Sequence, residues 1–369
     1  MYIYMQKFIE IEVFMSNRIT TSDFQTFEVI TKNGDVLTFK VKIKDKSLLH
    51  NKEHLQTIIS EIEKFCCIRQ GPSTNNLTKL RADKKTGLEL NFLHDEATIK
   101  KGSFILTIPD YSKIKGLKTS THQLLDALTI KLTETGAASP NVKISLSEYM
   151  ATRGLKDRKE AKQQVKNDMQ ILRTASLTWE ETNKGKTECF KFVNIADSGE
   201  VKRNGDIVFT FGSTFYKALL KYSVMPYPNQ LQTLNNRKNP NSYCLLRKIS
   251  EHKCMNFGKV NENLISVKTL LNSAPYIPSY EEVMSTDRKC KERIIEVFER
   301  DMNAFEETVT WNYCHKLGKP LSNEELKEID YNIFENLLVK INWKDYPIMT
   351  LKRAANPQDN DNENSPYTP

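Results

Sequence analysis

The chain carries apolar residues at helical spacing in two stretches of its middle third. In the first stretch they follow Thr119, whose hydroxyl group is suited to cap a helix, and they are Leu124, Leu125, Leu128 and Leu132. In the second stretch they follow Asp157, another capping residue, at spacings of four, four and three, and they are Ala161, Val165, Met169 and Leu172. Both patterns predict helices that bury one face and expose the other.

A short helix is predicted between these two. Residues 143–155 have the composition of a short helix that ends in a glycine turn. Ser145 or Ser147 is suited to cap its first turn, and Gly154 to end it. The helix over 156–173 then follows after a tight turn.

A β-ribbon is predicted after the second long helix. Residues 176–179 alternate as a strand, and the chain returns through 190–195 after a turn that carries Lys184 and Lys186. Asn204–Gly205 predicts a further hairpin. Helix, turn, basic helix and β-ribbon in this order predict a winged helix-turn-helix, which lays its second helix in a DNA groove. A ribbon tip with two lysines is suited to contact phosphates.

The same order recurs in the second half of the chain. Its expected elements are a helix with Tyr243, Leu246 and Ile249 inward, a short helix at 266–271, a long helix with Ile294 or Ile295, Phe298, Met302 and Phe305 inward, a strand at 308–313, and a partner strand at 338–343 after an inserted helical stretch at 322–336. We therefore predict an α+β protein with two tandem winged helix-turn-helix domains.

Shifts in composition suggest where the domains end. Residues 16–115 form an N-terminal mixed α/β extension, 116–222 the first winged-helix domain and 223–352 the second. Residues 222–242, rich in Pro and Asn, are the expected seam between the two. The Asn-rich and Asp-rich residues 353–369 are expected to form a disordered tail.

The N-terminal extension offers local signals but no chemistry. Asn33–Gly34 between two alternating runs predicts a β-hairpin, His54 to Phe65 has helical spacing, and residues 104–108 form a strand that ends before Pro109. A structural or dimerisation role is the default reading. Met15 is an alternative start of the chain.

Composition and motifs narrow the class of protein. The net charge of +8 is compatible with a polyanionic partner. The chain has no apolar run of 18 residues and no signal peptide, so we expect a cytoplasmic protein that does not contact a membrane. Its seven cysteines include no Cys-x-x-Cys pair, so reduced cysteines are favoured over a metal site. The Walker motif and the His-x-His pair of nicking initiators are both missing. We predict neither an enzyme nor a cofactor.

The polar stripe of the basic helix is the main candidate site. Between Arg153 and Arg173 there are seven Lys or Arg residues against Asp157, Glu160 and Asp168, a local balance of +4. Lysines hold phosphates, whereas Gln and Asn amides also read base edges. The predicted DNA-binding residues of this domain are Arg158, Lys159, Lys162, Gln163, Lys166, Asn167, Gln170, Lys184 and Lys186. The same pattern is also typical of an ordinary solvated helix face.

The second domain is the weaker candidate. Between 281 and 310, nine acidic residues outnumber five basic ones. DNA contact is therefore predicted only at the start of its long helix, through Arg288, Lys289 and Lys291. A cluster of Lys and Arg between 237 and 259 is either a source of phosphate contacts or a set of solvated loop charges.

The order of elements over residues 104–315 resembles the winged-helix replication initiators of iteron-containing plasmids. The resemblance is carried by Gln123-Leu-Leu-Asp-Ala-Leu before the first helix-turn-helix, by Tyr243-Cys-Leu-Leu-Arg-Lys at the opening of the second half, and by the basic-then-apolar helix over 288–311. The first hundred residues and the insert between the last two strands have no counterpart in that family.

This resemblance implies a protein that binds repeated origin sites on double-stranded DNA, helps to open the duplex, and recruits the host initiator and the replicative helicase. It also implies a homodimer formed through the first winged domain. A transcriptional regulator built from the same two modules remains the alternative. A structural or phage-assembly protein with incidental basic helices is a third possibility, and it predicts no sequence-specific DNA binding.

Overall fold

The computed structural model describes residues 12–15, 24–30, 36–42, 65–70, 88–91, 94–101, 104–108, 118–135, 137–183, 186–256, 258–286, 288–315, 318–344 and 348–352. The chain divides into two compact units. One unit comprises 1–62, 134–136 and 347–369, and the other comprises 63–133 and 137–346. Both predicted winged-helix segments therefore belong to the second unit, except for residues 134–136 and 347–352.

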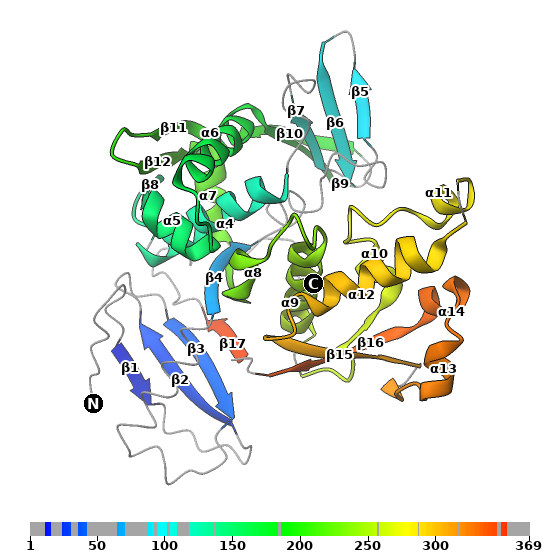
Figure 1. Cartoon of the computed structure of the whole chain (residues 1–369). Helices are drawn as coiled ribbons and strands as arrows, with labels where there is room; N and C mark the ends of the chain where they lie inside the picture. The colour runs from blue at the N-terminus through cyan, green and yellow to red at the C-terminus, as the bar shows by residue number, and fades with distance from the viewer. Residues whose placement is uncertain are drawn as a thin grey trace. The chain divides into compact units, whose positions relative to one another are not determined.

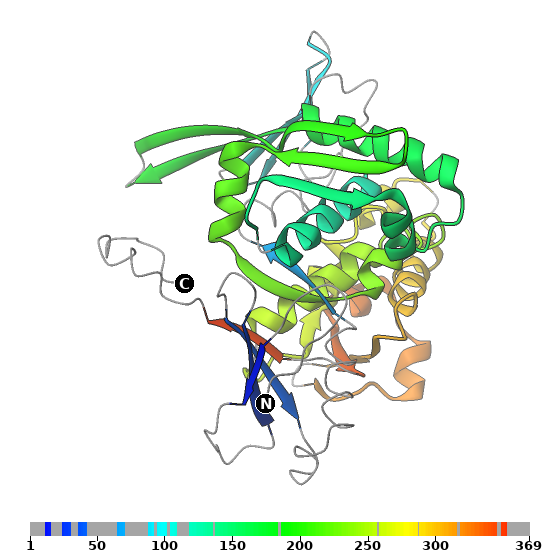
Figure 2. The ribbon, with the colours of Figure 1, turned by 90° about the vertical axis from the view of Figure 1, so that its left-hand side faces the viewer.

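The first unit contains a four-stranded antiparallel sheet built from both ends of the chain. Its order is β1 (Glu12–Met15), β2 (Phe24–Ile30), β3 (Val36–Lys42) and β17 (Ile348–Lys352). β2 pairs with β3 in the register expected of a hairpin around Asn33–Gly34, which confirms that prediction for the strands. The pairing of β17 with β3, where the red and blue strands meet in Figure 2, is not encoded in any local pattern.

In the second unit, the first half opens with a helix, a strand and two further helices. These are α4 (Thr119–Glu134), β8 (Asn141–Ser145), α5 (Leu146–Arg153) and α6 (Arg158–Thr174). β11 (Ala196–Val201) and β12 (Asp206–Phe211) follow, and the three strands form one sheet in the order β11-β12-β8. α7 (Ser213–Lys221) completes this half (Figure 1). The predicted short helix begins later than expected, because residues 141–145 pair with β12 as a strand.

Local chemistry explains these boundaries. The Ser145 hydroxyl accepts a hydrogen bond from Glu148 N at the start of α5, and Gly154 ends that helix in the left-handed region at φ 62°. The Asp157 carboxylate caps α6 by accepting from Glu160 N at 2.7 Å. The four apolar positions predicted to face inward on α6 are all buried: Ala161, Val165, Met169 and Leu172. Both long-helix predictions of this half are confirmed.

The second half repeats this order. It comprises α9 (Ser242–Met255), β14 (Leu264–Ser266), α10 (Val267–Leu271), α11 (Tyr280–Met284), a π-helical turn (Lys291–Ile295), α12 (Glu296–Asn303), β15 (Val309–Cys314), α13 (Asn323–Lys327), α14 (Tyr331–Asn336) and β16 (Leu338–Trp343). Its three strands form a sheet in the order β14-β16-β15. In both halves the strand that comes last in the chain lies in the middle of the sheet and pairs with the other two. Each half is consistent with a winged helix.

The π-helical turn resolves one ambiguity of the sequence. Helical spacing allows either Ile294 or Ile295 to face inward, but both side chains are buried. A π turn inserts an extra residue into the helix and brings both positions to the core side. Phe298, Met302 and Phe305 are buried beyond it, as predicted.

Two further sheets join segments that sequence pattern did not connect. β4 (Phe65–Gln70) pairs with β13 (Ser223–Pro228), and a five-stranded sheet has the order β10-β9-β7-β6-β5. The strands of the five-stranded sheet are β5 (Leu88–Asn91), β6 (Glu96–Lys101), β7 (Phe104–Ile108), β9 (Ser176–Asn183) and β10 (Lys186–Asn194).

Strand β4 corrects a sequence prediction. Phe65, the last residue of the helix predicted from His54, begins strand β4, and the rest of that helix lies outside the described residues. The expected seam at 222–242 contains β13 and the short helix α8 (Gln230–Thr233).

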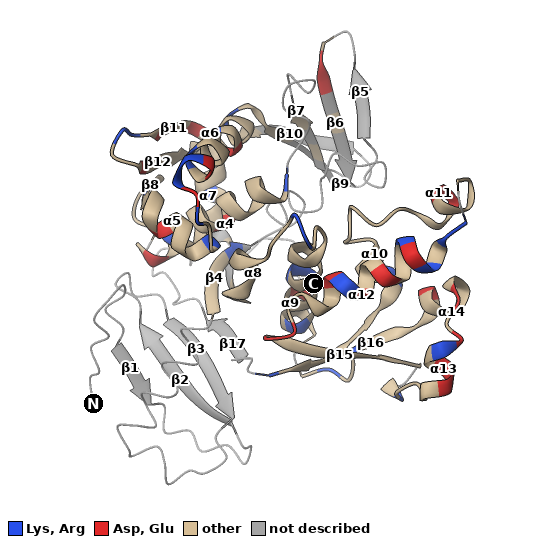
Figure 3. Ribbon diagram, viewed as in Figure 1, with Lys and Arg blue, Asp and Glu red and all other residues tan. Residues whose placement is uncertain are grey.

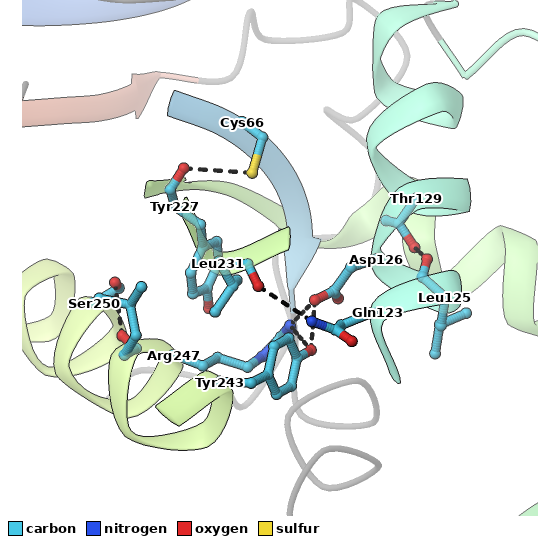
Figure 4. A network of polar contacts seen from close by, with 11 residues as sticks. Cys66, Gln123, Leu125, Asp126, Thr129, Tyr227, Leu231, Tyr243, Arg247 and Ser250 are labelled. Atoms are coloured by element: carbon cyan, nitrogen blue, oxygen red, sulfur yellow. Dashed lines mark hydrogen bonds and ion pairs between the residues drawn. The ribbon is translucent and has the colours of Figure 1, made fainter. Parts of the chain in front are cut away.

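α4 and α9, which open the two halves, meet in a buried polar contact (Figure 4). The Tyr243 hydroxyl and the Arg247 Nη1 atom both donate to the Asp126 Oδ2 atom at 2.5 Å. The Arg247 guanidinium also lies over the Tyr227 ring, 5.0 Å from its centre. Burial raises the pKa of the Tyr243 hydroxyl well above its usual value. This contact joins the two halves inside one unit.

Candidate nucleic-acid interface

α6 presents the predicted polar stripe to solvent. Lys159, Gln163, Lys166, Asn167 and Gln170 are exposed, while the opposite face is buried in the core of the first half. The Gln163 Nε2 atom donates to the Asn167 Oδ1 atom at 3.0 Å, so the two amides form a pair along the helix. The stripe therefore offers three exposed side-chain amides together with two exposed lysines.

Two of the predicted DNA-binding cations have a structural partner. Arg158 Nη1 donates to the Ser147 hydroxyl oxygen at 3.1 Å, and Arg158 Nη2 donates to the Asn204 carbonyl oxygen at 3.4 Å. Lys162 Nζ donates to the Lys202 carbonyl oxygen at 3.2 Å. These contacts attach α6 to the turn between β11 and β12. They make Arg158 and Lys162 positioning residues as well as surface cations.

The β11–β12 turn is compact and basic. Asp206 N donates to the Asn204 side chain, and the Asp206 carboxylate is 2.8 Å from the Lys143 ammonium. Hydrogen bonds from Lys143 and then Asn204 lower the pKa of the Asp206 carboxyl. Gly205 has φ 98°, a region that favours glycine. Lys202 and Arg203 are exposed at the tip (Figure 3).

This turn and the ribbon that the sequence predicted around Lys184 and Lys186 lie in different sheets. β9 and β10 belong to the five-stranded sheet, whereas β11 and β12 share a sheet with β8. α6 packs directly against β11, where the Met169 methyl group lies over Gly199. Sequence alternation marks both hairpins equally and does not show which one joins β8. Lys184 and the side chain of Lys186 lie outside the described residues.

The inner face of α6 carries a buried carboxylate. Asp168 is 2% exposed, and its Oδ1 atom accepts from the Thr121 hydroxyl at 2.7 Å and from the Ser120 hydroxyl at 3.0 Å. Burial raises the pKa of the Asp168 carboxyl, and the Thr121 and Ser120 hydrogen bonds partly oppose that rise. The contact anchors α6 to the first turn of α4.

The second half presents a different surface. Arg288, Lys289 and Lys291 are exposed ahead of α12, and Arg288 has a left-handed backbone at φ 59°. Exposed acids follow at Glu292 and Glu296. The chain between β15 and β16 forms α13 and α14, with exposed carboxylates at Glu324, Glu325, Glu328 and Asp330. Figure 3 shows both signs of charge over this half.

The cluster of cations between 237 and 259 divides into two groups. Arg247 pairs with Asp126, Lys253 with Glu262, and Lys248 lies 3.8 Å from Glu251. These three side chains serve the fold of α9. Arg237 and Lys238 are exposed, and Arg237 Nη2 lies 3.9 Å from the Glu160 carboxylate on α6. The structure therefore places one end of this cluster beside the first basic helix.

We also searched the described part of the chain for a metal site, a membrane-spanning helix and a reactive cysteine. Among the described residues, no group of three or more His, Cys, Asp or Glu side chains is arranged to hold a metal ion. No described helix is long and apolar enough to cross a membrane. Burial raises the pKa of the Cys66 thiol, which makes that cysteine a poor nucleophile.

Comparison with known proteins gives a limited result. No family model matches the chain, and no curated protein matches it. The crystal structure of selenomethionine derivatives of domains 2 and 3 of RctB aligns with a TM-score of 0.38 and 10% identity, covering 71% of this chain and 97% of that one. A second structure of RctB domains 2–3 aligns with a TM-score of 0.36 and 10% identity, covering 72% and 96%. At these values we infer neither fold nor function from RctB, and membership of the iteron plasmid initiators stays a prediction.

Proposed function

We propose that this chain is a sequence-specific double-stranded DNA-binding protein built from two tandem winged helix-turn-helix modules. The observation that carries the proposal is the exposed stripe of α6 beside the basic β11–β12 turn. A helix with exposed amides and lysines can read base edges and phosphates in a major groove. The turn attached to it is placed to reach the neighbouring backbone as a wing.

The proposed contacts divide by chemistry. Lys159 and Lys166 hold phosphates on either side of the groove, because each ammonium is exposed on the outer face of α6. Gln163, Asn167 and Gln170, on the same exposed face, read base edges. Lys202 and Arg203 hold a further phosphate at the wing. In the second half, contacts are limited to the residues ahead of α12, Arg288, Lys289 and Lys291, since acids occupy the surface beyond.

We further propose that the biological role is replication initiation at repeated origin sites of a plasmid or mobile element, with recruitment of host replication proteins. Two modules of one connectivity, joined by α4 and α9, suit a target that repeats at a fixed spacing. The resemblance of residues 104–315 to plasmid initiators supports this role over the alternative, a transcriptional regulator. The two roles require the same contacts and differ in the arrangement of their targets.

Selection of bound sequences from random duplex DNA tests the proposal directly. We expect enrichment of one motif and, beside the gene, direct repeats of that motif. A single operator-like copy would favour the regulator, and absence of any enriched motif would contradict sequence-specific binding.

A matched pair of variants locates the readout. Gln163→Ala is expected to relax preference at one position of the motif by about 1–3 kcal/mol. Gln164→Ala, its half-buried neighbour, is expected to leave the motif unchanged. If Gln163→Ala selects the same motif with undiminished preference, base reading lies outside this stripe.

A further inference from the structure

A cleft lies between the turn that joins α5 to α6 and the loop that follows α8. Its volume is about 250 Å³. The lining residues that bear on its chemistry are Arg153, Lys156, Asp157, Glu160, Asn236 and Arg237. One wall of the cleft is formed by residues at the α5–α6 turn and the start of α6. The other is formed by the segment that connects α8 to α9. The cleft opens beside the first turn of α6.

Arg153 is the buried cation of this cleft. It is 6% exposed, and its Nε atom donates to the Gln232 carbonyl oxygen at 2.8 Å. Its Nη1 atom donates to the Tyr149 hydroxyl oxygen at 3.0 Å. Both contacts are to neutral oxygens, and no carboxylate forms an ion pair with Arg153 among the described residues. No described carboxylate is in contact with the guanidinium, although the buried Asp168 carboxylate is near enough for the two charges to attract.

The remaining charges of the cleft leave an excess of positive charge. Lys156 and Arg237 are exposed at its rim, so three cations face two carboxylates. The Asp157 carboxylate accepts the Glu160 N–H group, and the Glu160 carboxylate is 3.9 Å from Arg237 Nη2 in an exposed setting where such a pair is weak. The first N–H groups of α6 point toward this end of the helix, and their dipoles add to the positive potential.

We infer that this cleft binds one phosphate group of the DNA backbone. This inference rests on the proposed DNA-binding function and extends it to a second contact surface beside α6. The volume of about 250 Å³ lies below the range of roughly 300–1,000 Å³ that is usual for small-molecule sites, so a phosphodiester fits better than a whole nucleotide. A planar guanidinium with two rim cations is well suited to hold phosphate oxygens.

The contact has a consequence for the architecture of the complex. Arg237 lies in the segment that leads into α9, so the phosphate would be held between the two halves of the unit. Binding of a backbone phosphate there fixes the second half next to the groove that α6 reads. The spacing between the two modules on DNA is then set by the protein and not by a flexible linker.

The test uses the double variant Lys156→Ala/Arg237→Ala in the full chain, because both side chains are exposed and their removal does not open the core. Lys238→Ala is the matched control, since Lys238 is an exposed neighbour that does not line the cleft. Duplex affinity is measured over a range of salt concentrations. The double variant should lower the slope of log K against log salt by about one, with the same preferred motif. An unchanged slope would overturn the inference.

Phosphate ethylation along the duplex identifies the group that is bound. One ethylated position should weaken binding of the wild-type protein and of Lys238→Ala by about tenfold, and have no further effect on the double variant. If ethylation at a position weakens the double variant as much as it weakens the wild-type protein, the cleft does not hold the phosphate at that position. If this is the result at every position where ethylation weakens wild-type binding, the inference fails.

Inorganic phosphate separates this inference from the proposed function. If the wild-type protein binds no duplex selectively, the proposed function fails. In that case a rise of the melting temperature in millimolar phosphate, present in wild type and absent in the double variant, would still support a phosphate cleft. Equal melting temperatures would overturn it. A phosphate response combined with an unchanged salt slope on DNA would assign the cleft to free phosphate and contradict the DNA backbone as its ligand.

Discussion

The two halves of the larger unit share one connectivity but present opposite surfaces. Each has a helix, a strand, further helical segments that end in a long helix, and two closing strands, with the last strand in the middle of the sheet. In the first half the long helix exposes lysines and amides, and the closing strands meet in a tight basic turn. In the second half the long helix exposes acids after its first turn, and two helices occupy the place of that turn. The shared connectivity gives each half a long helix in the corresponding place, and the exposed side chains give the first of these helices the chemistry that our proposal requires for reading DNA.

The inner faces of the two long helices differ as well. Asp168 of α6 is buried against two hydroxyl groups, with no cation in contact among the described residues. Asp301 of α12 accepts from the Asn241 backbone N–H and side-chain amide through Oδ2 and pairs with Arg300 through Oδ1. The inner carboxylate of α12 is therefore held by an arginine and an asparagine, whereas that of α6 is held by two hydroxyl groups.

The largest effect is expected where the two halves meet. Asp126→Ala leaves the Arg247 guanidinium buried without its carboxylate, and breaking such a pair typically lowers the free energy of unfolding by about 3–5 kcal/mol. Urea unfolding, followed by fluorescence of the tryptophans, measures the loss. Lys259→Ala, which removes an exposed cation just after α9, should cost under about 1 kcal/mol. If Asp126→Ala costs as little as Lys259→Ala, the contact does not join the halves energetically.

The salt dependence of DNA affinity should show the clearest difference between the two long helices. Lys159→Ala/Lys166→Ala removes two exposed cations from α6 and should lower the salt slope by about two, with an affinity loss of roughly 10- to 100-fold near 0.1 M salt. Arg288→Ala/Lys291→Ala is the matched change ahead of α12 and should lower the slope by one or less. Filter binding or fluorescence anisotropy at several salt concentrations provides the comparison. Equal losses from both pairs would show that the two halves contribute alike.

The turns provide a finer comparison. A Cβ atom at Gly205 would lie 2.6 Å from Arg158 Nη2, and φ 98° is itself unfavourable for alanine. Gly205→Ala should therefore lower stability by about 1 kcal/mol or more and also weaken DNA binding, because Arg158 no longer holds the turn against α6. Gly318→Ala, at φ 76° between β15 and β16, should lower stability alone. Thermal melts combined with anisotropy distinguish the two outcomes, and undiminished DNA affinity in Gly205→Ala would remove the turn from the interface.

Sequence periodicity located most of the candidate site but not its neighbours in space. The caps at Asp157 and Gly154 and the buried stripe of α6 are local signals, and each was confirmed by the structure. The identity of the wing was not local, because alternation marks β9–β10 and β11–β12 alike, and only the pairing of β12 with β8 separates them. For the same reason the contacts of Arg158 and Lys162 with the turn, and the approach of Arg237 to α6, could not be read from spacing. Long-range pairing and side-chain direction depend on tertiary packing.

The smallest effect concerns Asp168, and its sign follows from the direction of the pKa shift. Burial raises the folded-state pKa of this carboxyl above its unfolded value, so between those two values the folded protein binds more protons, and stability falls as pH rises. Asp168→Asn keeps an acceptor for Thr121 and removes the buried charge. It should raise the free energy of unfolding by about 0.5–1 kcal/mol at pH 7 and flatten that dependence. Urea unfolding at a series of pH values upward from about 4, the ordinary pKa of an Asp carboxyl, measures the difference. Asp301→Asn, the inner carboxylate of α12, should instead destabilise across this range because it loses Arg300 as a charged partner. If both variants shift stability in the same direction, the two helices are anchored by the same chemistry, and the contrast between the halves holds only at their surfaces.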